Sequence, residues 1–281
     1  MRNKRRQLVR RGSRQVGVTL VEMMVVVAIA ALMVGLTIPA ANMLLNSFES
    51  ESGAKSIISA AMASARAIAA KEQRYAGIRF QKRYDPNNPD PLNESQYIIF
   101  IVKTAGQQSN SLDYGFRAVD GIQPIKLPDS IGAMDLFYRS DLVAGNNPDV
   151  SFANSNVIND TTTFSIIFSP SGKLVIHDVR IRNRDEYGDY TSYNNKNSMD
   201  DIFNKKAVVD AGLAMFYQDD YYGDNSYPNM GLGQESSRNS FVIYDTKKLK
   251  QTDVNYRWTN YLSLLKPIYI NPYTGTIINE K

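Results

Sequence analysis

The residues able to carry out chemistry in this sequence are few. The 281 residues include one histidine, His177, and no cysteine. Disulfides, thiolate metal sites, zinc sites of ordinary composition and Cys/His nucleophilic pairs are therefore excluded. A serine triad would need His177, yet no Gly-x-Ser-x-Gly elbow accompanies it. His177 alternates with Val175 and Val179, which predicts a half-exposed position in a strand rather than a catalytic base.

Two acidic segments have the composition of cation-binding loops. They run from Asp185 to Asp189 and from Asp219 to Asn225, and each contains a glycine. Oxygen-rich loops of this kind can bind calcium, but neither has the twelve-residue spacing of an EF-hand. Solvated turns are the simpler interpretation. We predict no metal, no cofactor and no enzymatic activity.

A carboxylate inside an apolar run is the third candidate. Residues 18–38 are apolar except for two threonines, a glycine and Glu22. As a helix this run would span roughly 31 Å, about the thickness of one bilayer core. A charge at the bilayer centre costs about 2.5 to 3.5 kcal/mol, and less near the interface. Glu22 therefore either lies at the hydrated cytoplasmic headgroups or has a partner.

The charge distribution orients this apolar run. Residues 1–17 hold seven Lys and Arg side chains and no acid, so subtracting seven from the net charge of +4 leaves −3 for residues 18–281. The positive-inside rule keeps such a leader in the cytoplasm and sends the chain after about Ala40 across the membrane. The run exceeds a signal-peptide core of about 7 to 15 residues, and the Ile-Pro-Ala after it is not an Ala-x-Ala site. Because the remainder has no basic stripe, we do not expect a nucleic-acid partner.

The residues Gly17-Val18-Thr19-Leu20-Val21-Glu22, behind the arginine-rich leader, resemble the prepilin peptidase site of type IV pilins and type II secretion pseudopilins. The resemblance implies cleavage between Gly17 and Val18 by an integral-membrane aspartyl peptidase, which then methylates the new amine of Val18. It also implies that Glu22 neutralises the Val18 amine of a neighbouring subunit during assembly. Gly17 would allow the protease to approach the backbone closely. The family more often has phenylalanine where this sequence has Val18, whereas Pro39 matches the family's proline after the apolar run.

The rest of the chain predicts a folded body. An apolar stripe at helical spacing starts at Ile58 and ends at Ala69. Strands are expected near residues 77–81, 96–102, 164–168 and 241–244, with a hairpin of residues 164–168 and 174–181 about the turn Ser169 to Gly172. The stripe and the hairpin resemble those of the H-type pseudopilin and related minor pilins. Residues 182–239 are polar and rich in tyrosine, which favours a surface extension.

We therefore expect an α+β fold in which a long N-terminal helix, half transmembrane and half amphipathic, packs on an antiparallel β-sheet domain. The predicted segments are the leader (1–17), the transmembrane helix (18–38), its amphipathic continuation (39–76), the sheet domain (77–181) and the extension with terminal strands (182–281). The function implied by the resemblance is that of a minor subunit of a type II secretion pseudopilus or type IV pilus. It would be anchored by a single pass in the bacterial cytoplasmic membrane, with a periplasmic C-terminal domain. Its partners would be prepilin peptidase, other pilin-like subunits and the assembly platform. The alternative is a membrane-anchored periplasmic enzyme or binding protein.

Overall fold

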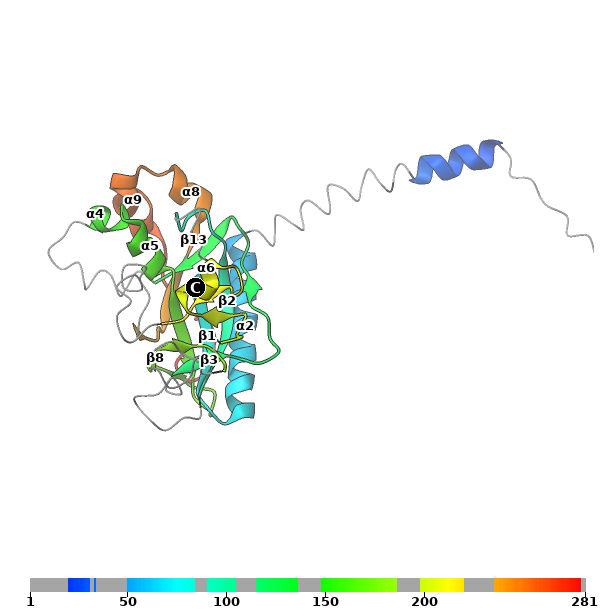
Figure 1. Cartoon of the computed structure of the whole chain (residues 1–281). Helices are drawn as coiled ribbons and strands as arrows, with labels where there is room; N and C mark the ends of the chain where they lie inside the picture. Colours follow the sequence, from blue (N-terminus) through cyan, green and yellow to red (C-terminus); the bar gives the residue numbers. More distant parts are fainter. Residues whose placement is uncertain are drawn as a thin grey trace, which may run out of the picture. The chain divides into compact units, whose positions relative to one another are not determined.

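The computed structural model describes residues 20–30, 33, 50–83, 90–104, 115–135, 148–185, 198–219 and 235–278 (Figure 1). The chain divides into two compact units, Met1–Asn46 and Ser47–Lys281. In the first unit, residues 20–30 form a helix and Met33 is also helical.

The prediction of one long N-terminal helix is wrong. The helix described in the first unit covers about three turns, and the next helix, α2, starts afresh at Glu51 and ends at Glu72. The side chain of Ser50 accepts a hydrogen bond from the backbone N–H of Gly53, at 3.2 Å. Such an N-cap satisfies a donor that a continuous helix would satisfy internally, so Ser50 marks a new start.

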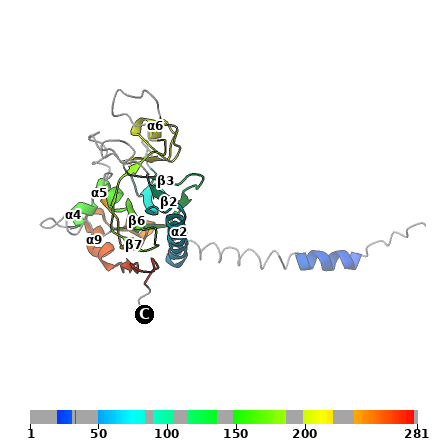
Figure 2. The ribbon, with the colours of Figure 1, turned by 90° about the horizontal axis from the view of Figure 1, so that it is seen from below.

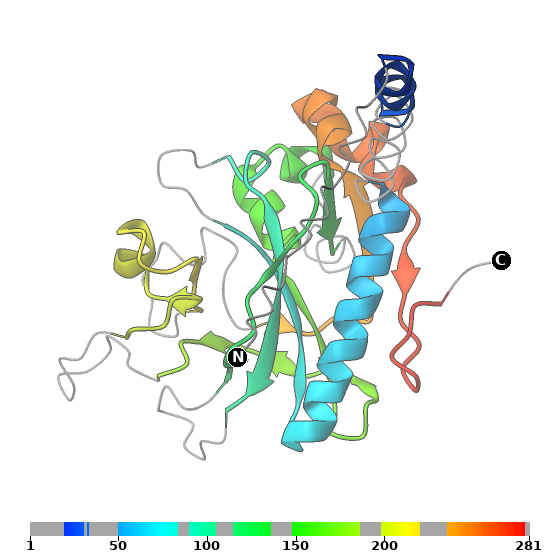
Figure 3. The same cartoon turned by 90° about the vertical axis from the view of Figure 1, so that its right-hand side faces the viewer.

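Helix α2 buries the predicted apolar stripe. Ile58, Ala61, Met62, Ala65 and Ala69 are all buried, and they lie on one face because they are three or four residues apart. Figure 3 shows α2 lying along a sheet. The helix is capped by Gln73, which has a left-handed backbone and whose N–H donates to the carbonyl of Ala69.

Seven strands make up the main sheet. They are β1 (Ala76–Lys82), β2 (Gln96–Lys103), β3 (Phe116–Ala118), β4 (Ile125–Lys126), β6 (Phe164–Phe168), β7 (Leu174–Val175) and β9 (Ile181–Arg182). Their order is β7-β6-β1-β2-β3-β9, with β4 also paired to β2. The long strands lie where clusters of β-branched and aromatic residues predict them.

An antiparallel sheet was predicted, and this is also wrong, because the sheets are mixed. Strand β9 pairs parallel to β3, with Phe116 opposite Ile181. The chain leaves the hairpin at one edge of the sheet, at β7, and joins the opposite edge at β9. A second parallel pair joins β10 (Phe203–Asn204) to β11 (Phe216–Tyr217). A parallel pairing made by a crossing connection has no local pattern of apolar and polar residues, so the sequence does not predict it.

The predicted hairpin is confirmed only at its base. Phe168 pairs with Leu174 and Ile167 with Val175, about the turn at Gly172. The expected second strand, residues 174–181, is divided among β7, β8 (Asp178–Val179) and β9, and each of these has a different partner.

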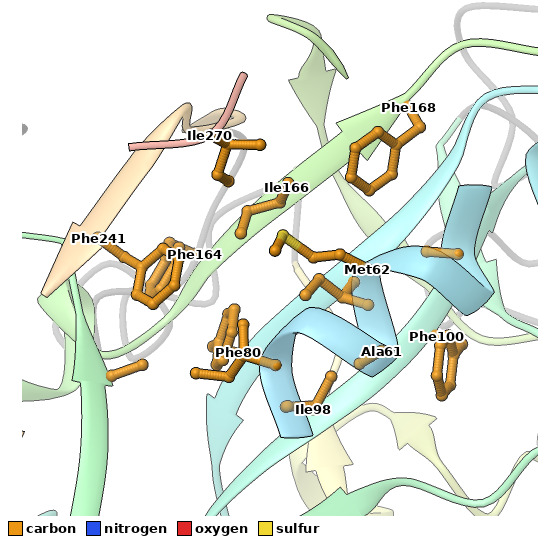
Figure 4. Packing of buried hydrophobic residues seen from close by; sticks show 14 of the residues in the cluster. Ala61, Met62, Phe80, Ile98, Phe100, Phe164, Ile166, Phe168, Phe241 and Ile270 are labelled. Atoms are coloured by element: carbon orange, nitrogen blue, oxygen red, sulfur yellow. The ribbon is translucent and has the colours of Figure 1, made fainter. Parts of the chain in front are cut away.

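Both faces of the main sheet are covered. The face toward α2 packs into a cluster that includes Met62, Phe80, Ile98 and Ile166 (Figure 4). The opposite face, with Ile99 and Ile101, packs against side chains from β10 and β11. In Figure 2, β2 and β3 lie between α2 and the segment that carries α6 (Lys206–Asp210). This double cover explains why every residue of β1 is buried.

The C-terminal third contributes strands and helical turns to this unit. These elements are β12 (Glu235–Ser236), β13 (Ser240–Asp245), α8 (Thr246–Gln251), η1 (Val254–Tyr256), α9 (Arg257–Asn260), η2 (Leu262–Leu264) and β14 (Ile268–Tyr269). Strand β13 pairs with β14 and with β5 (Ile131–Met134), and β12 pairs with β8. A third apolar cluster joins β5, β13, α8, α9 and η2 to α4 (Pro148–Phe152) and α5 (Ser155–Thr161). The strand expected near residues 241–244 is thus confirmed.

Candidate functional site

The sequence-predicted site is only partly described. Gly17 and Val18, the predicted cleavage and methylation positions, lie outside the described residues. Glu22 lies on the helix of residues 20–30, and its side chain is exposed within this unit. Within the described residues no helix meets the length and apolarity needed to cross a membrane.

The helix that carries Glu22 has apolar side chains on all of its faces. Large exposed side chains include Leu20, which is 77% exposed, together with Met23, Val27 and Ile29. A water-soluble surface helix normally has a polar face, whereas this one has a single charged residue, Glu22. An exposed apolar surface of this kind marks a site of interaction with lipid or with another apolar surface.

His177 was predicted to lie in a strand, and this is wrong. It lies between β7 and β8 and is half-buried. Its Nδ1 is 2.6 Å from the carbonyl oxygen of Asp178, so Nδ1 carries the proton and donates. Its Nε2 then accepts from the ammonium of Lys103, at 3.0 Å. The ring also packs against Tyr75 and Phe116. With both nitrogens engaged, the imidazole is not placed as a general base.

Of the two acidic segments, only the first residues, Asp185 and Asp219, lie within the described residues, and both have partners in the protein. Asp219 is fully buried in contact with a guanidinium, and Asp185 accepts from Ser198 and from the backbone N–H of Met199. No group of three or more potential metal-ligating side chains occurs in the part of the chain that the structure describes.

A buried ionic network, which the sequence did not reveal, joins charged side chains of the body. Arg79, at the centre of β1, places Nη2 at 3.1 Å from Asp219 and Nη1 at 3.6 Å from Glu235. Glu235 also lies 3.6 Å from Nη2 of Arg238, whose Nε donates to Asp135. Two guanidiniums therefore link three carboxylates from distant parts of the chain.

Burial dominates the electrostatics of this network. Desolvation raises the pKa of Glu235 to about 8, although the nearby guanidiniums of Arg79 and Arg238 oppose the change. It also raises the pKa of Asp219, against the opposing charge of Arg79 and the backbone N–H of Ile181, which donates to Asp219 at 2.6 Å. Because its pKa lies above neutrality, the carboxyl of Glu235 can hold a proton near pH 7.

Lys82, at the end of β1, is a further buried charge. Its ammonium donates to the carbonyl of Glu94 at 2.9 Å. Desolvation, with a smaller contribution from Lys250, lowers the pKa of Lys82 to about 8. A buried amine of this kind is partly neutral near that pH, but no paired base or carbonyl-binding group is placed beside it by these contacts.

A pocket of about 320 Å³ lies between β13 and the helical turns that follow it. Phe241, Leu262 and the indole of Trp258 contribute to its mainly apolar wall. The indole stacks on Phe152, with centroids 5.6 Å apart. Burial alone would raise the pKa of Asp149, but hydrogen bonds from Thr259 and from the N–H of Trp258 outweigh burial and lower it. Asp149 therefore anchors the backbone at Trp258, beside the pocket.

Comparisons with protein-family models, with curated proteins and with solved structures gave no match to this chain.

Sequence reasoning missed Arg79, Asp219 and Glu235. One signal was present, because Arg79 interrupts the strand pattern Gly77-Ile78-Arg79-Phe80-Gln81. A charge inside a strand covered on both faces requires a buried counter-charge. Nothing in the sequence shows that the counter-charge is 140 residues away.

Proposed function

We propose that this chain is a structural minor subunit of a bacterial type II secretion pseudopilus or type IV pilus. In this proposal, prepilin peptidase cleaves after Gly17 and methylates Val18, and residues 18–38 anchor the chain in the cytoplasmic membrane. The unit formed by residues 47–281 then lies outside that membrane. Assembly joins the chain to other pilin-like subunits on the membrane platform.

The observation that carries the proposal is the position of Glu22. It is the only charge on a helix whose large apolar side chains are exposed, and it follows Gly17-Val18 at the spacing of the family motif. The apolar surface favours lipid or another apolar helix over water. Glu22 would be costly in either setting unless it were paired. The amine created at Val18 by cleavage is a suitable counter-charge on a neighbouring subunit.

The body supports a structural role. Its single histidine is engaged at both ring nitrogens, and the buried carboxylates of Asp219 and Asp135 are paired with arginines. These contacts connect separate parts of the fold, which suits a subunit that must hold its shape in a filament.

The experiment is terminal sequencing by mass spectrometry of the protein recovered from membranes. We expect a chain that begins at N-methylated Val18. A chain that begins at Met1, or near Ala40, would rule the proposal out, because the first is unprocessed and the second is the product of a signal peptidase.

The pocket near Trp258 favours the second candidate, a membrane-anchored binding protein. The two functions can be separated with two variants. Ser263 lines the pocket and is exposed, so Ser263→Trp should fill the pocket without disturbing the core. A binding protein should lose its cellular function with Ser263→Trp and keep it with Glu22→Gln. A filament subunit should show the reverse.

A further inference from the structure

One segment of the body has a charge opposite to that of the rest. Residues 246–266 contain four lysines and one arginine against one aspartate, which gives +4, whereas residues 18–281 as a whole sum to −3. Arg257 is buried, so the exposed charge of the segment is +3. The segment therefore carries a net positive charge on a body whose overall net charge is negative.

Apolar side chains are exposed within the same segment. Leu264 is 72% exposed and Tyr256 is 53% exposed, and Val254 lies on the same run of short helices. Lys247, Lys248 and Lys250 are exposed on α8, and Lys266 is exposed after η2. Lysines interleaved with exposed Leu and Tyr are typical of a surface that lies at a membrane interface.

The position of the segment within the body is defined by its contacts. The ammonium of Lys248 lies 5.0 Å from the ring centroid of Tyr261, and the hydroxyl of Tyr261 accepts from the backbone N–H of Asp245. The charge of Glu51, at the start of α2, acts on Tyr261. Figures 1 and 3 show α8 and α9 at the end of the body where α2 begins.

The chain enters the body at this same end. Residues 39–49 connect the apolar run to Ser50, and eleven residues can span at most about 38 Å. We propose that the surface formed by α8, η1, α9 and η2 binds the anionic headgroups of the bilayer in which the apolar run is anchored. The lysines contact lipid phosphates, and Tyr256 and Leu264 enter the interface. This inference rests on the proposed membrane anchoring.

The test uses residues 47–281, a compact unit that contains all of the apolar clusters described above. Sedimentation should show binding to vesicles of phosphatidylcholine mixed with phosphatidylglycerol, and much weaker binding to phosphatidylcholine alone. Each lysine at an anionic surface contributes about five-fold in affinity, so Lys247→Gln with Lys250→Gln should weaken binding about 25-fold. High salt should have a similar effect.

The matched control is Lys71→Gln with Lys173→Gln, which also removes two exposed charges. Lys71 lies at the C-terminal end of α2, away from the proposed surface. Lys173 lies in the turn after β6, and this turn is near the same end of α2, because Phe168 of β6 pairs with Ala76 just beyond α2. This double variant should bind within about two-fold of the parent, because its lysines are more than a Debye length of about 8 to 10 Å from the proposed surface. Circular dichroism checks that each variant is folded.

Equal loss in the two double variants, or equal binding to the two kinds of vesicle, would overturn the inference. Because residues 47–281 lack the cleavage site, this result is independent of N-terminal processing. A chain that is never cleaved after Gly17 would contradict the proposed function and leave the vesicle result standing.

Discussion

Replacing Arg79 by methionine tests whether the buried network holds the body together. Methionine keeps a straight apolar side chain and removes the guanidinium. Asp219 would lose a partner at 3.1 Å in a place where neither side chain has any solvent exposure. Removing one member of such a pair typically costs 3 to 5 kcal/mol, because the other charge remains buried.

The loss of folding free energy caused by Arg79→Met should lie at the lower end of that range. Asp219 keeps the backbone N–H of Ile181 at 2.6 Å and the nearby charges of Arg180 and Arg182. Without Arg79 the pKa of Asp219 should rise further, so protonation limits the penalty. We expect the free energy of unfolding to fall by about 3 kcal/mol near neutral pH, and by less in acid.

Urea unfolding of residues 47–281 measures this change, and a double-mutant cycle isolates the pair. Asp219→Asn keeps an acceptor for Ile181 and removes the charge. The double variant should lose less free energy of unfolding than the sum of the losses in the two single variants, by about 2 kcal/mol.

Lys126→Met is the control, because Lys126 pairs with Asp129 on the surface, where the two side chains are 48% and 72% exposed. It should cost less than about 1 kcal/mol. If Arg79→Met costs no more than Lys126→Met, or if the two single changes simply add, the network does not stabilise the fold in the way we infer.

Three further changes test other parts of the reasoning. Gly17→Trp should block processing, because the peptidase needs an unencumbered backbone; immunoblotting should show accumulated precursor, and a normal mature band would mean that the cleavage site is misplaced. Glu22→Gln should leave insertion and cleavage intact but impair assembly, because the Val18 amine would be buried without its counter-charge, at a cost of about 3 to 5 kcal/mol; wild-type crosslinking to other pilin-like subunits would refute this. Glu235, with its pKa raised from 4.5 to about 8, holds a proton in the folded state that the unfolded chain has lost. Its contribution to stability is complete below about pH 4.5 and is lost as the pH rises through 8. In urea titrations the free energy of unfolding of the parent should therefore fall as the pH rises across this range, and that of Glu235→Gln should fall less.

The sequence was sufficient where a pattern is local. The stripe from Ile58 to Ala69 repeats every three or four residues, and α2 buries it. Strands β1, β2, β6 and β13 formed where β-branched and aromatic residues cluster. These elements depend on contacts within a few residues or on simple burial, so composition and spacing predict them.

Pairings between distant segments could not be predicted in the same way. The start of α2 at Ser50 depends on one capping hydrogen bond, and the parallel pairing of β9 with β3 depends on a crossing chain. Asp219 was taken for a solvated loop residue because its neighbours are polar, yet it is buried against Arg79. A one-dimensional pattern records the polarity of a residue but not the tertiary partner that makes its burial possible.

Arg79 also fixes the two ends of one connection. Asp219 precedes the segment 220–234 and Glu235 follows it, and both carboxylates contact the same guanidinium. The distance between these ends is therefore set by the body and not by the residues that join them. Lengthening a connection between fixed ends adds only about 0.6 kcal/mol of closure entropy for each doubling. A tag or a foreign epitope inserted between Asp219 and Glu235 should accordingly leave the body folded, which makes this a suitable site for labelling the protein.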